Sequence, residues 1–196
     1  HGEAPVPVVS PDKKWEAYVK DNNLYISPVR DEKEKDKPKE EIALTMDGTT
    51  NLRYDAWSII WSPDSRKLAT VKVRDVQERR IPLIESSPSS QKQPILQWRD
   101  YAKPGDVLPV YLPVLFDVEA RRQVALDVAP YENQYYLNLT GWRKDSRAFT
   151  FEFNQRGHQR YVIGEVNAAD GSIRHLVDEQ TKTFIYYYNN FRYDLN

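Results

Sequence analysis

The sequence contains no cysteine, one methionine and seven glycines among its 196 residues. Without cysteine the chain can form no disulfide and can offer no thiolate to a metal or a substrate. It has no apolar run long enough to cross a bilayer, so we expect no membrane-spanning helix. The formal net charge of −1 gives no electrostatic reason to expect nucleic acid as a partner.

Apolar and aromatic residues, in contrast, are plentiful. Hydrophobic residues make up 40% of the chain and charged residues 29%, which is enough to build a core beneath a hydrated surface. Thirteen tyrosines and five tryptophans favour broad β-sheets, because aromatic side chains fit a pleated, half-buried surface. No segment has the pattern of a strong amphipathic helix, so we expect an all-β fold.

One short phrase occurs three times, as "VSPDKKWEAYVK" (9–20), "WSPDSRKLATVKV" (61–73) and "GWRKDSRAFTFEF" (141–153). Each copy has a turn, built in the second from Ser62, Pro63 and Asp64, followed by a strand that alternates with period two and has one buried face. The first two copies are 52 positions apart and the last two 81, which leaves room for an insertion. A recurrence of about 40–50 residues is typical of propeller blades. The repeat therefore predicts a partial β-propeller of about three to four antiparallel, four-stranded blades.

Other segments have shorter signals. Alternation and turn residues predict a hairpin of 15–20 and 23–27 across Asp21-Asn22, strands at 42–45, 57–61 and 79–88, and hairpins at 114–128 and 160–178. The charged segment 30–41 is interpreted as a solvated loop, with a functional charged arm as the alternative. Four prolines between Gln91 and Pro113 predict an extended excursion rather than a regular blade strand.

The phrases "WSPDSRKLATVKVRD", "YAKPGDVLPVYLPVLFDVE" and "GWRKDSRAFTFEFNQRGHQRYVIGEVNAADG", in this order, resemble the amino-terminal propeller of the dipeptidyl peptidase IV branch of the prolyl oligopeptidase family, especially its bacterial members. The resemblance runs from about residue 10 to residue 196. It implies an eight-bladed propeller joined to an α/β-hydrolase domain that removes short peptides from amino termini. It also implies that the propeller limits access to the nucleophile and helps to hold the substrate's free amino end.

The chain departs from that family pattern in two ways. It contains no Gly-x-Ser-x-Gly string, the signature of the nucleophile elbow, so the hydrolase domain is absent and no catalytic residue is predicted. Family members hold the substrate's ammonium with paired glutamates, whereas the corresponding stretch here, "NLRYDAWSII" (51–60), contains Asp55 and no Glu. Asp55 is therefore the candidate for the substrate's amino group, with one carboxylate in place of two.

Four further charged residues are candidates for facing a channel or a substrate. Arg74, Arg80 and Glu85 would line an inner rim near a peptide's carboxylate, with solvated strand ends as the alternative. Arg156 belongs to a polar hairpin tip that would face the channel or a partner domain. The alternative there is an exposed turn in which Gly157 adopts a left-handed conformation.

We interpret the chain as the non-catalytic propeller segment of a serine exopeptidase, inactive alone, whose partners are its own carboxy-terminal hydrolase domain and a peptide substrate. The alternative is a self-contained protein-interaction module. Open blade faces would favour a homodimer or larger assembly. His1, His158 and His175 have no metal-ligand spacing, so no metal and no cofactor is expected. We expect a bacterial envelope, periplasmic or secreted location, with the cytoplasm as the alternative.

Overall fold

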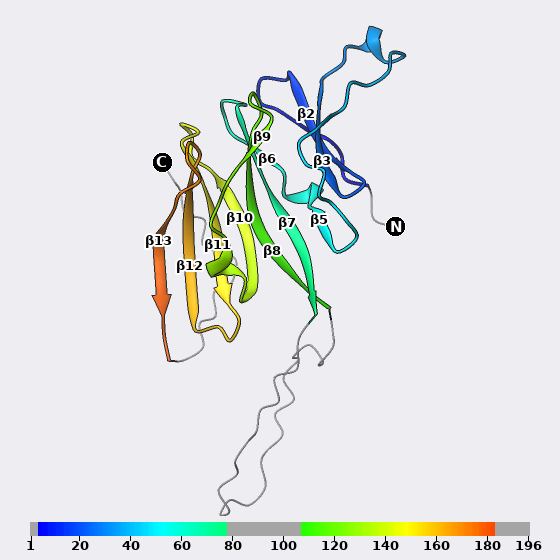
Figure 1. Cartoon of the computed structure of the whole chain (residues 1–196). Helices are drawn as coiled ribbons and strands as arrows, with labels where there is room; N and C mark the ends of the chain where they lie inside the picture. The colour runs from blue at the N-terminus through cyan, green and yellow to red at the C-terminus, as the bar shows by residue number, and fades with distance from the viewer. Residues whose placement is uncertain (1–3, 78–106, 183–196) are drawn as a thin grey trace, which may run out of the picture.

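The computed structural model describes residues 4–77 and 107–182, and almost all regular structure within them is β. The strands form three antiparallel sheets that stand next to one another (Figure 1). Three single turns of 3-10 helix complete the described elements: η1 (Glu32–Glu34), η2 (Ala56–Ser58) and η3 (Ala129–Tyr131). The all-β prediction is confirmed, and the three sheets follow one another along the chain as the blades of a propeller do.

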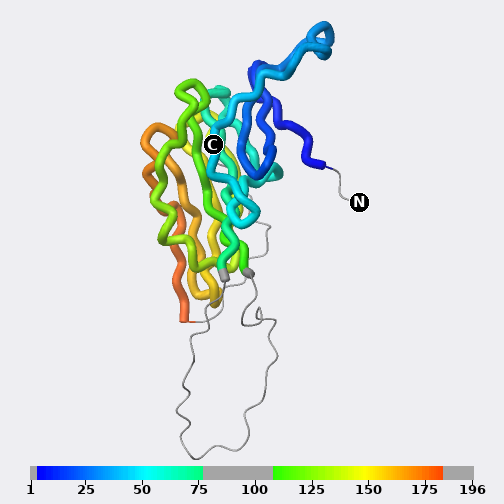
Figure 2. The backbone as a smooth tube through the Cα atoms, turned by 45° about the vertical axis from the view of Figure 1, so that its right-hand side comes forward, coloured from blue at the N-terminus to red at the C-terminus, as the bar shows by residue number. Residues whose placement is uncertain are grey.

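Sheet 1 contains β1 (Val8–Val9), β2 (Trp15–Lys20), β3 (Asn23–Pro28) and β4 (Ile42–Ala43), in that order. The predicted hairpin between β2 and β3 is confirmed. Asp21 and Asn22 form its two-residue turn with φ of 49° and 64°, values that asparagine and aspartate tolerate better than most residues. The charged segment 30–41 is a mostly exposed loop that contains η1 and projects away from the sheets (Figure 2).

Sheet 2 contains β5 (Leu52–Tyr54), β6 (Ile60–Trp61), β7 (Lys67–Gln77), β8 (Val107–Asp117) and β9 (Arg122–Val124). Both β5 and β6 pair with β7, so together they take the place of one first strand. The predicted strand over 57–61 is wrong in its first half, because 56–58 fold as η2. The predicted strand at 79–88 lies outside the described residues.

The prediction of an irregular excursion over 91–113 is wrong where the structure describes it. From Val107 onward the chain is the first half of β8, which pairs with β7 along its whole length. Two of the four prolines that suggested an excursion, Pro109 and Pro113, are accommodated within this ladder, and the other two lie outside the described residues.

The reason lies in the alternation of backbone groups along β8. Tyr111, between Pro109 and Pro113, turns its N–H and C=O away from β7, toward the side-chain amide of Gln134, at 2.8 and 2.9 Å. Pro109 and Pro113 are two positions away on either side, so their nitrogens also point away from β7. Neither proline therefore removes a hydrogen bond from the β7–β8 ladder.

Sheet 3 contains β10 (Gln134–Trp142), β11 (Ala148–Gln155), β12 (Arg160–Asn167) and β13 (Ile173–Gln180), in that order. Each strand pairs antiparallel with the next. The hairpin predicted at 160–178 is confirmed as β12 and β13, and the hairpin predicted at 114–128 is confirmed as the β8–β9 pair.

Two apolar layers fill the spaces between the sheets. The layer between sheets 1 and 2 includes Leu24, Ile26, Leu68 and Phe116, and the layer between sheets 2 and 3 includes Ala69, Leu115, Phe149, Phe151 and Phe153. Successive side chains of a strand point to opposite faces, so the neighbours Leu68 and Ala69 belong to different layers. The first half of β7 is thus buried on both faces, whereas its sequence pattern predicted only one buried face.

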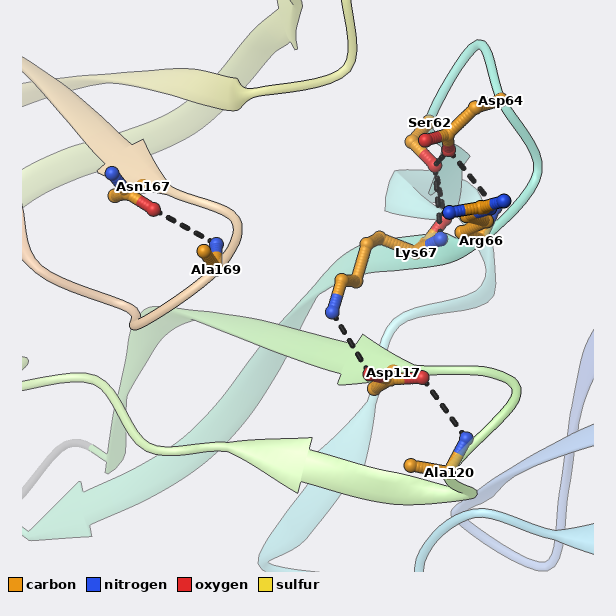
Figure 3. A network of polar contacts seen from close by, with 8 residues as sticks. All are labelled: Ser62, Asp64, Arg66, Lys67, Asp117, Ala120, Asn167 and Ala169. Carbon is orange, nitrogen blue, oxygen red and sulfur yellow. Dashed lines mark hydrogen bonds and ion pairs between the residues drawn. The ribbon is translucent and has the colours of Figure 1, made fainter.

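The three repeated turns share one backbone geometry, and the first two also share a serine hydroxyl bond at a position where the third has Arg143. In the second turn the Ser62 hydroxyl donates to Asp64 Oδ1 at 2.6 Å, and the Arg66 N–H donates to the same oxygen at 3.0 Å (Figure 3). In all three turns the residue after the aspartate has a positive φ: Lys13 (60°), Ser65 (62°) and Ser146 (63°). The repeated phrase therefore encodes a specific turn, and not merely a polar loop.

The second and third turns are also bonded to the sheet that precedes each of them. The Asp12 N–H donates to Ser65 Oγ at 3.0 Å, and the Asp64 N–H donates to Ser146 Oγ at 2.9 Å. The serine at the left-handed position thus satisfies a backbone amide that a neighbouring sheet leaves open.

A tryptophan four residues before each serine makes a second bond of the same kind. Trp61 Nε1 donates to the carbonyl of Val8 at 2.9 Å, and Trp142 Nε1 donates to the carbonyl of Ile60 at 3.1 Å. We call each pair of bonds, one from tryptophan and one to serine, a clamp. The clamps explain the repetition in the sequence, because each later copy binds the copy before it.

Replacing Ser146 with glycine is expected to lower the free energy of unfolding by about 1–2 kcal/mol, because the Asp64 amide loses its acceptor in a part-buried hydrogen bond. Glycine tolerates the φ of 63° at this position, so backbone strain does not contribute. Chemical denaturation measures the change. Ser146→Asn keeps an acceptor and the left-handed conformation, and should lose less. An unchanged denaturation midpoint in the glycine variant would contradict the clamp.

Candidate functional site

A pocket of about 250 Å³ lies between sheets 2 and 3. Its polar lining residues are Asp55, Ser58 and Asn138, two aromatic rings come from Trp57 and Tyr111, and aliphatic side chains of β6, β7 and β10 complete the wall. Pockets for drug-sized ligands measure about 300–1,000 Å³. This pocket is smaller, and therefore suits one small group rather than a whole ligand.

Asp55 is fixed at the pocket by its backbone and by its side chain. Its N–H donates to the carbonyl of Val71 at 2.9 Å, and its own carbonyl accepts the Thr70 hydroxyl at 2.8 Å. The carboxylate caps η2: Oδ1 accepts the Trp57 N–H at 3.1 Å and Oδ2 accepts the Ser58 hydroxyl. An aspartate at the N-cap position satisfies the open amides of a helical turn in this way.

The charge of Asp55 is not balanced by any cation in the described part of the chain. The nearby basic residues are paired elsewhere, with Arg53 at 3.0 Å from Asp75 and Lys72 at 2.8 Å from Asp47. Trp57, with 72% of its surface exposed, stands beside the carboxylate. An unbalanced carboxylate next to an exposed indole ring can attract a cation.

The model of the dipeptidyl peptidase IV N-terminal region matches residues 1–194. The chain belongs to this family. No curated protein sequence matches it.

Three solved structures are similar to this chain, and the one with a TM-score above 0.5 shares its fold. Dipeptidyl peptidase 4 of Porphyromonas gingivalis has a TM-score of 0.60 and 15% identity, covering 91% of this chain and 26% of its own. An acylaminoacyl peptidase of Pyrococcus horikoshii (TM-score 0.47, 15% identity) covers 89% of this chain and 25% of its own. For TolB of Acinetobacter baumannii (TM-score 0.43, 14% identity), the match covers 87% of this chain and 31% of TolB. The chain thus spans about a quarter of the length of the Porphyromonas enzyme.

Two other predicted site residues, Arg74 and Arg156, do not line the Asp55 pocket. Arg74 pairs with Glu132 at 2.8 Å, and the Arg156 N–H donates to the carbonyl of Asn133 at 3.1 Å. Both therefore meet the segment that leads into β10. Because Glu132 already balances the charge of Arg74, a peptide carboxylate would have to compete with it. The remaining candidates, Arg80 and Glu85, lie outside the described residues.

The sequence interpretation missed the other polar and aromatic lining residues of the pocket: Trp57, Ser58, Tyr111 and Asn138. A signal for Trp57 and Ser58 exists, because aspartate is one of the residues preferred at a helix N-cap. It was obscured by the apolar residues that follow, which favoured a strand. Nothing local indicates Tyr111 or Asn138, since folding alone brings β8 and β10 to this point.

His175 takes part in a polar network on the last strand of sheet 3. Its Nδ1 lies 3.0 Å from Asp178 Oδ2 and its Nε2 lies 2.7 Å from the hydroxyl of Tyr131. Bonds from Arg160, at 2.9 and 3.0 Å, are the main reason that the pKa of Asp178 falls to about 2. The network fixes η3 against β13, which is a structural role.

The described residues contain no cluster of three or more histidine or acidic side chains arranged to hold a metal ion. Within the same ranges no helix is long and apolar enough to cross a membrane.

Proposed function

We propose that this chain is the propeller segment of a serine exopeptidase of the dipeptidyl or tripeptidyl type, and that it gates and positions peptides for a separate hydrolase domain. The family match over residues 1–194 supports the general assignment. The observation that carries the positioning role is the pocket at Asp55, where a fixed carboxylate has no balancing cation among the described residues.

The pocket's place in the fold supports access to a peptide. A propeller arranges its blades around a central channel, and the clamp between Trp142 and Ile60 holds β6 against β10. The pocket lies at these first strands, which would face the channel in a closed ring. A peptide that enters the channel would then meet Asp55 at the wall.

The chemistry of the pocket suits the ammonium group at a peptide's amino end. A carboxylate accepts charge-assisted hydrogen bonds from an ammonium group, and the Trp57 ring adds attraction for the same charge. Both carboxylate oxygens already accept a bond from η2, so their remaining lone pairs would face the ligand. The η2 bonds hold the carboxylate in one orientation before the ligand arrives.

The role of Asp55 can be tested in the complete reading frame that contains this chain, with a chromogenic peptide that ends in proline. Asp55→Asn keeps the cap on η2, because asparagine is an equally good N-cap, but removes the charge. We expect KM to rise at least tenfold for a substrate with a free amino group, since a hydrogen bond to a charged group contributes about 1.5–3 kcal/mol. An acetylated substrate should show no change.

Glu119→Gln is the matched control, because Glu119 is exposed in the β8–β9 turn and its loss changes the net charge equally. An unchanged KM in Asp55→Asn would reject the ammonium site. The 196-residue chain alone should not hydrolyse either peptide, and turnover abolished by a single serine substitution within it would reject the non-catalytic assignment. A stop codon soon after Asn196 would favour the alternative, a self-contained interaction module.

A further inference from the structure

β10 is the first strand of sheet 3, and hydrogen bonds tie it to sheet 2 near both of its ends. At one end, the side-chain amide of Gln134 bonds the N–H and C=O of Tyr111 at 2.8 and 2.9 Å. At the other end, Trp142 Nε1 donates to the carbonyl of Ile60 at 3.1 Å. Residues 137–139 lie between these two ties and line the pocket described above. The pocket is therefore an opening of limited length along β10.

The pocket meets the edge of β10 and not only its side chains. Successive side chains of a strand point to opposite faces, yet three consecutive residues, 137–139, line the pocket. The direction of the backbone groups follows from β11, which pairs with β12 without a register shift. The Ala148 carbonyl accepts the Arg143 N–H at 2.9 Å, and the N–H of Arg156, directly after β11, donates to the Asn133 carbonyl at 3.1 Å. Even-numbered residues of β11 therefore direct their N–H and C=O toward β10.

Leu137 and Leu139 leave their backbone groups open. Asn138 lies opposite Glu152, which points toward β10, so these two residues exchange backbone hydrogen bonds. Leu137 and Leu139 lie opposite odd-numbered residues of β11, so their N–H and C=O point away from β11. None of these four groups has a hydrogen-bond partner within residues 4–77 and 107–182. Leu137 is 2% exposed, and buried backbone groups without a partner are rare in folded proteins. The pocket thus contains open donors and acceptors besides a carboxylate.

Irregular pairing marks both limits of the open stretch. The register of β10 against β11 shifts between Gln134 and Tyr136, and again between Leu139 and Gly141. Gly141 has a φ of 149°, a conformation that glycine adopts far more readily than other residues. Bulges of this kind re-aim a strand and are frequent beside functional sites.

We propose that the pocket receives the amino end of a peptide in extended conformation, with its ammonium group at Asp55 and its first amide groups bonded to Leu137 and Leu139. The inference rests on the ammonium site proposed above and adds a second element to the recognition of the same substrate. An extended peptide presents an N–H and a C=O to one side at every second residue, about 7 Å apart. The open groups of β10 have the same spacing, and peptides commonly bind the free edge of a sheet in this way.

Two features make the site specific for the end of a chain. The ties at Gln134 and Trp142 close the edge on both sides, so a strand that continued in both directions would meet them. The Asp55 carboxylate places a positive charge at one end of the bound segment. A lysine side chain carries the same charge on a methylene stem without an amide, so it would leave the groups of Leu137 and Leu139 open. The site therefore selects a free amino end over a lysine side chain.

The test compares three ligands of the 196-residue chain by NMR titration: Ala-Ala-Ala amide, the same peptide methylated on its backbone amide nitrogens, and butylamine. All three carry an ammonium group. We expect the unmodified peptide to bind at least tenfold more tightly than the other two, because methylated nitrogens cannot donate to β10 and butylamine has no amide. At saturation it should slow hydrogen exchange of the Leu139 amide at least fivefold. The Asn138 amide, already bonded to β11, is the internal control and should not change.

The outcomes separate this inference from the ammonium site on which it rests. Equal affinities of the three ligands, with an unchanged Leu139 amide, would overturn the edge pairing and leave the ammonium site standing. Equal protection of Leu139 by the methylated peptide would also overturn it, since water would then be excluded without a hydrogen bond. Equal protection by acetylated Ala-Ala-Ala amide would uphold the edge pairing and reject the ammonium site at Asp55. No binding of any ligand would reject both.

Discussion

Replacing Gly164 with alanine is expected to lower the free energy of unfolding by about 3 kcal/mol, at the upper end of the usual cost of overpacking. A Cβ at position 164 would lie 2.3 Å from Cζ of Phe151, which is directly opposite on β11. The Phe151 ring cannot retreat easily, since it is fully buried and its centre lies 4.9 Å from that of Tyr131. Thermal and chemical denaturation both measure the loss.

A double-mutant cycle separates this contact from a general intolerance of β12 to substitution. Phe151→Ala alone should cost about 3–5 kcal/mol, because it leaves a cavity in the layer between sheets 2 and 3. Combined with Gly164→Ala, the added methyl group occupies part of that cavity. The double variant should therefore lose at least 1 kcal/mol less than the two single losses together. Strict additivity would show that the two side chains do not compete for the same space.

Replacing Glu165 with glutamine is expected to lower the free energy of unfolding by about 3 kcal/mol, because it leaves the largely buried Arg143 without its anion, whereas Arg174 is 67% exposed and stays hydrated. The Glu165 side chain is 7% exposed and lies between Arg143, in the third turn, and Arg174 on β13. Arg174 Nε and Nη2 both lie 2.8 Å from Oε1, and Arg143 bonds Oε2. Glu41→Gln, which breaks a more exposed pair with Lys20, is the matched control and should cost under 1 kcal/mol.

The stabilisation from Glu165 should depend on pH, and the direction of its pKa shift fixes the sign. Burial alone would raise the pKa of Glu165, but the bonds from Arg143 and Arg174 outweigh it, so the pKa lies below its usual value of 4.5. The stabilisation is therefore fully present above pH 4.5 and is lost as the pH falls through the lowered pKa of the folded state. Denaturation at pH 7 and near pH 3 should show a large difference between wild type and Glu165→Gln at pH 7 and a smaller one in acid. An equal difference in stability at the two pH values would contradict the predicted loss of the Glu165 ion pairs in acid.

Local features of the fold could be predicted where a residue's own backbone preference decides the structure. Asp21 and Asn22 form the predicted hairpin turn because both tolerate positive φ. Predictions failed where a longer-range partner decided instead. Pro109 fits β8 because its nitrogen points away from β7, toward the side of the strand where Gln134 bonds Tyr111. The prediction at 56–58 failed for a local reason, because Asp55 caps this segment as η2 whereas the apolar residues after it suggested a strand.

In the candidate site, too, some residues could be predicted from the sequence and others could not. Asp55 could be chosen from the sequence, since it is the acidic residue in the stretch that resembles the family's ammonium-binding segment. Its surroundings could not, because Tyr111 and Asn138 reach the pocket from β8 and β10. Arg74 was equally plausible from the sequence, yet Glu132, from the segment before β10, neutralises it. Pairings of this kind depend on which strands become neighbours.

The sequence by itself determined that one turn and strand recur three times, and hence that the chain is built from similar antiparallel sheets. Only the tertiary structure decided what the repeated Trp61, Ser65, Trp142 and Ser146 bind, because their partners are backbone groups of the preceding sheet. Every residue but proline has the same N–H and C=O. A sequence can therefore show that a side chain needs a partner, but the stacking of the sheets determines which backbone group that partner is.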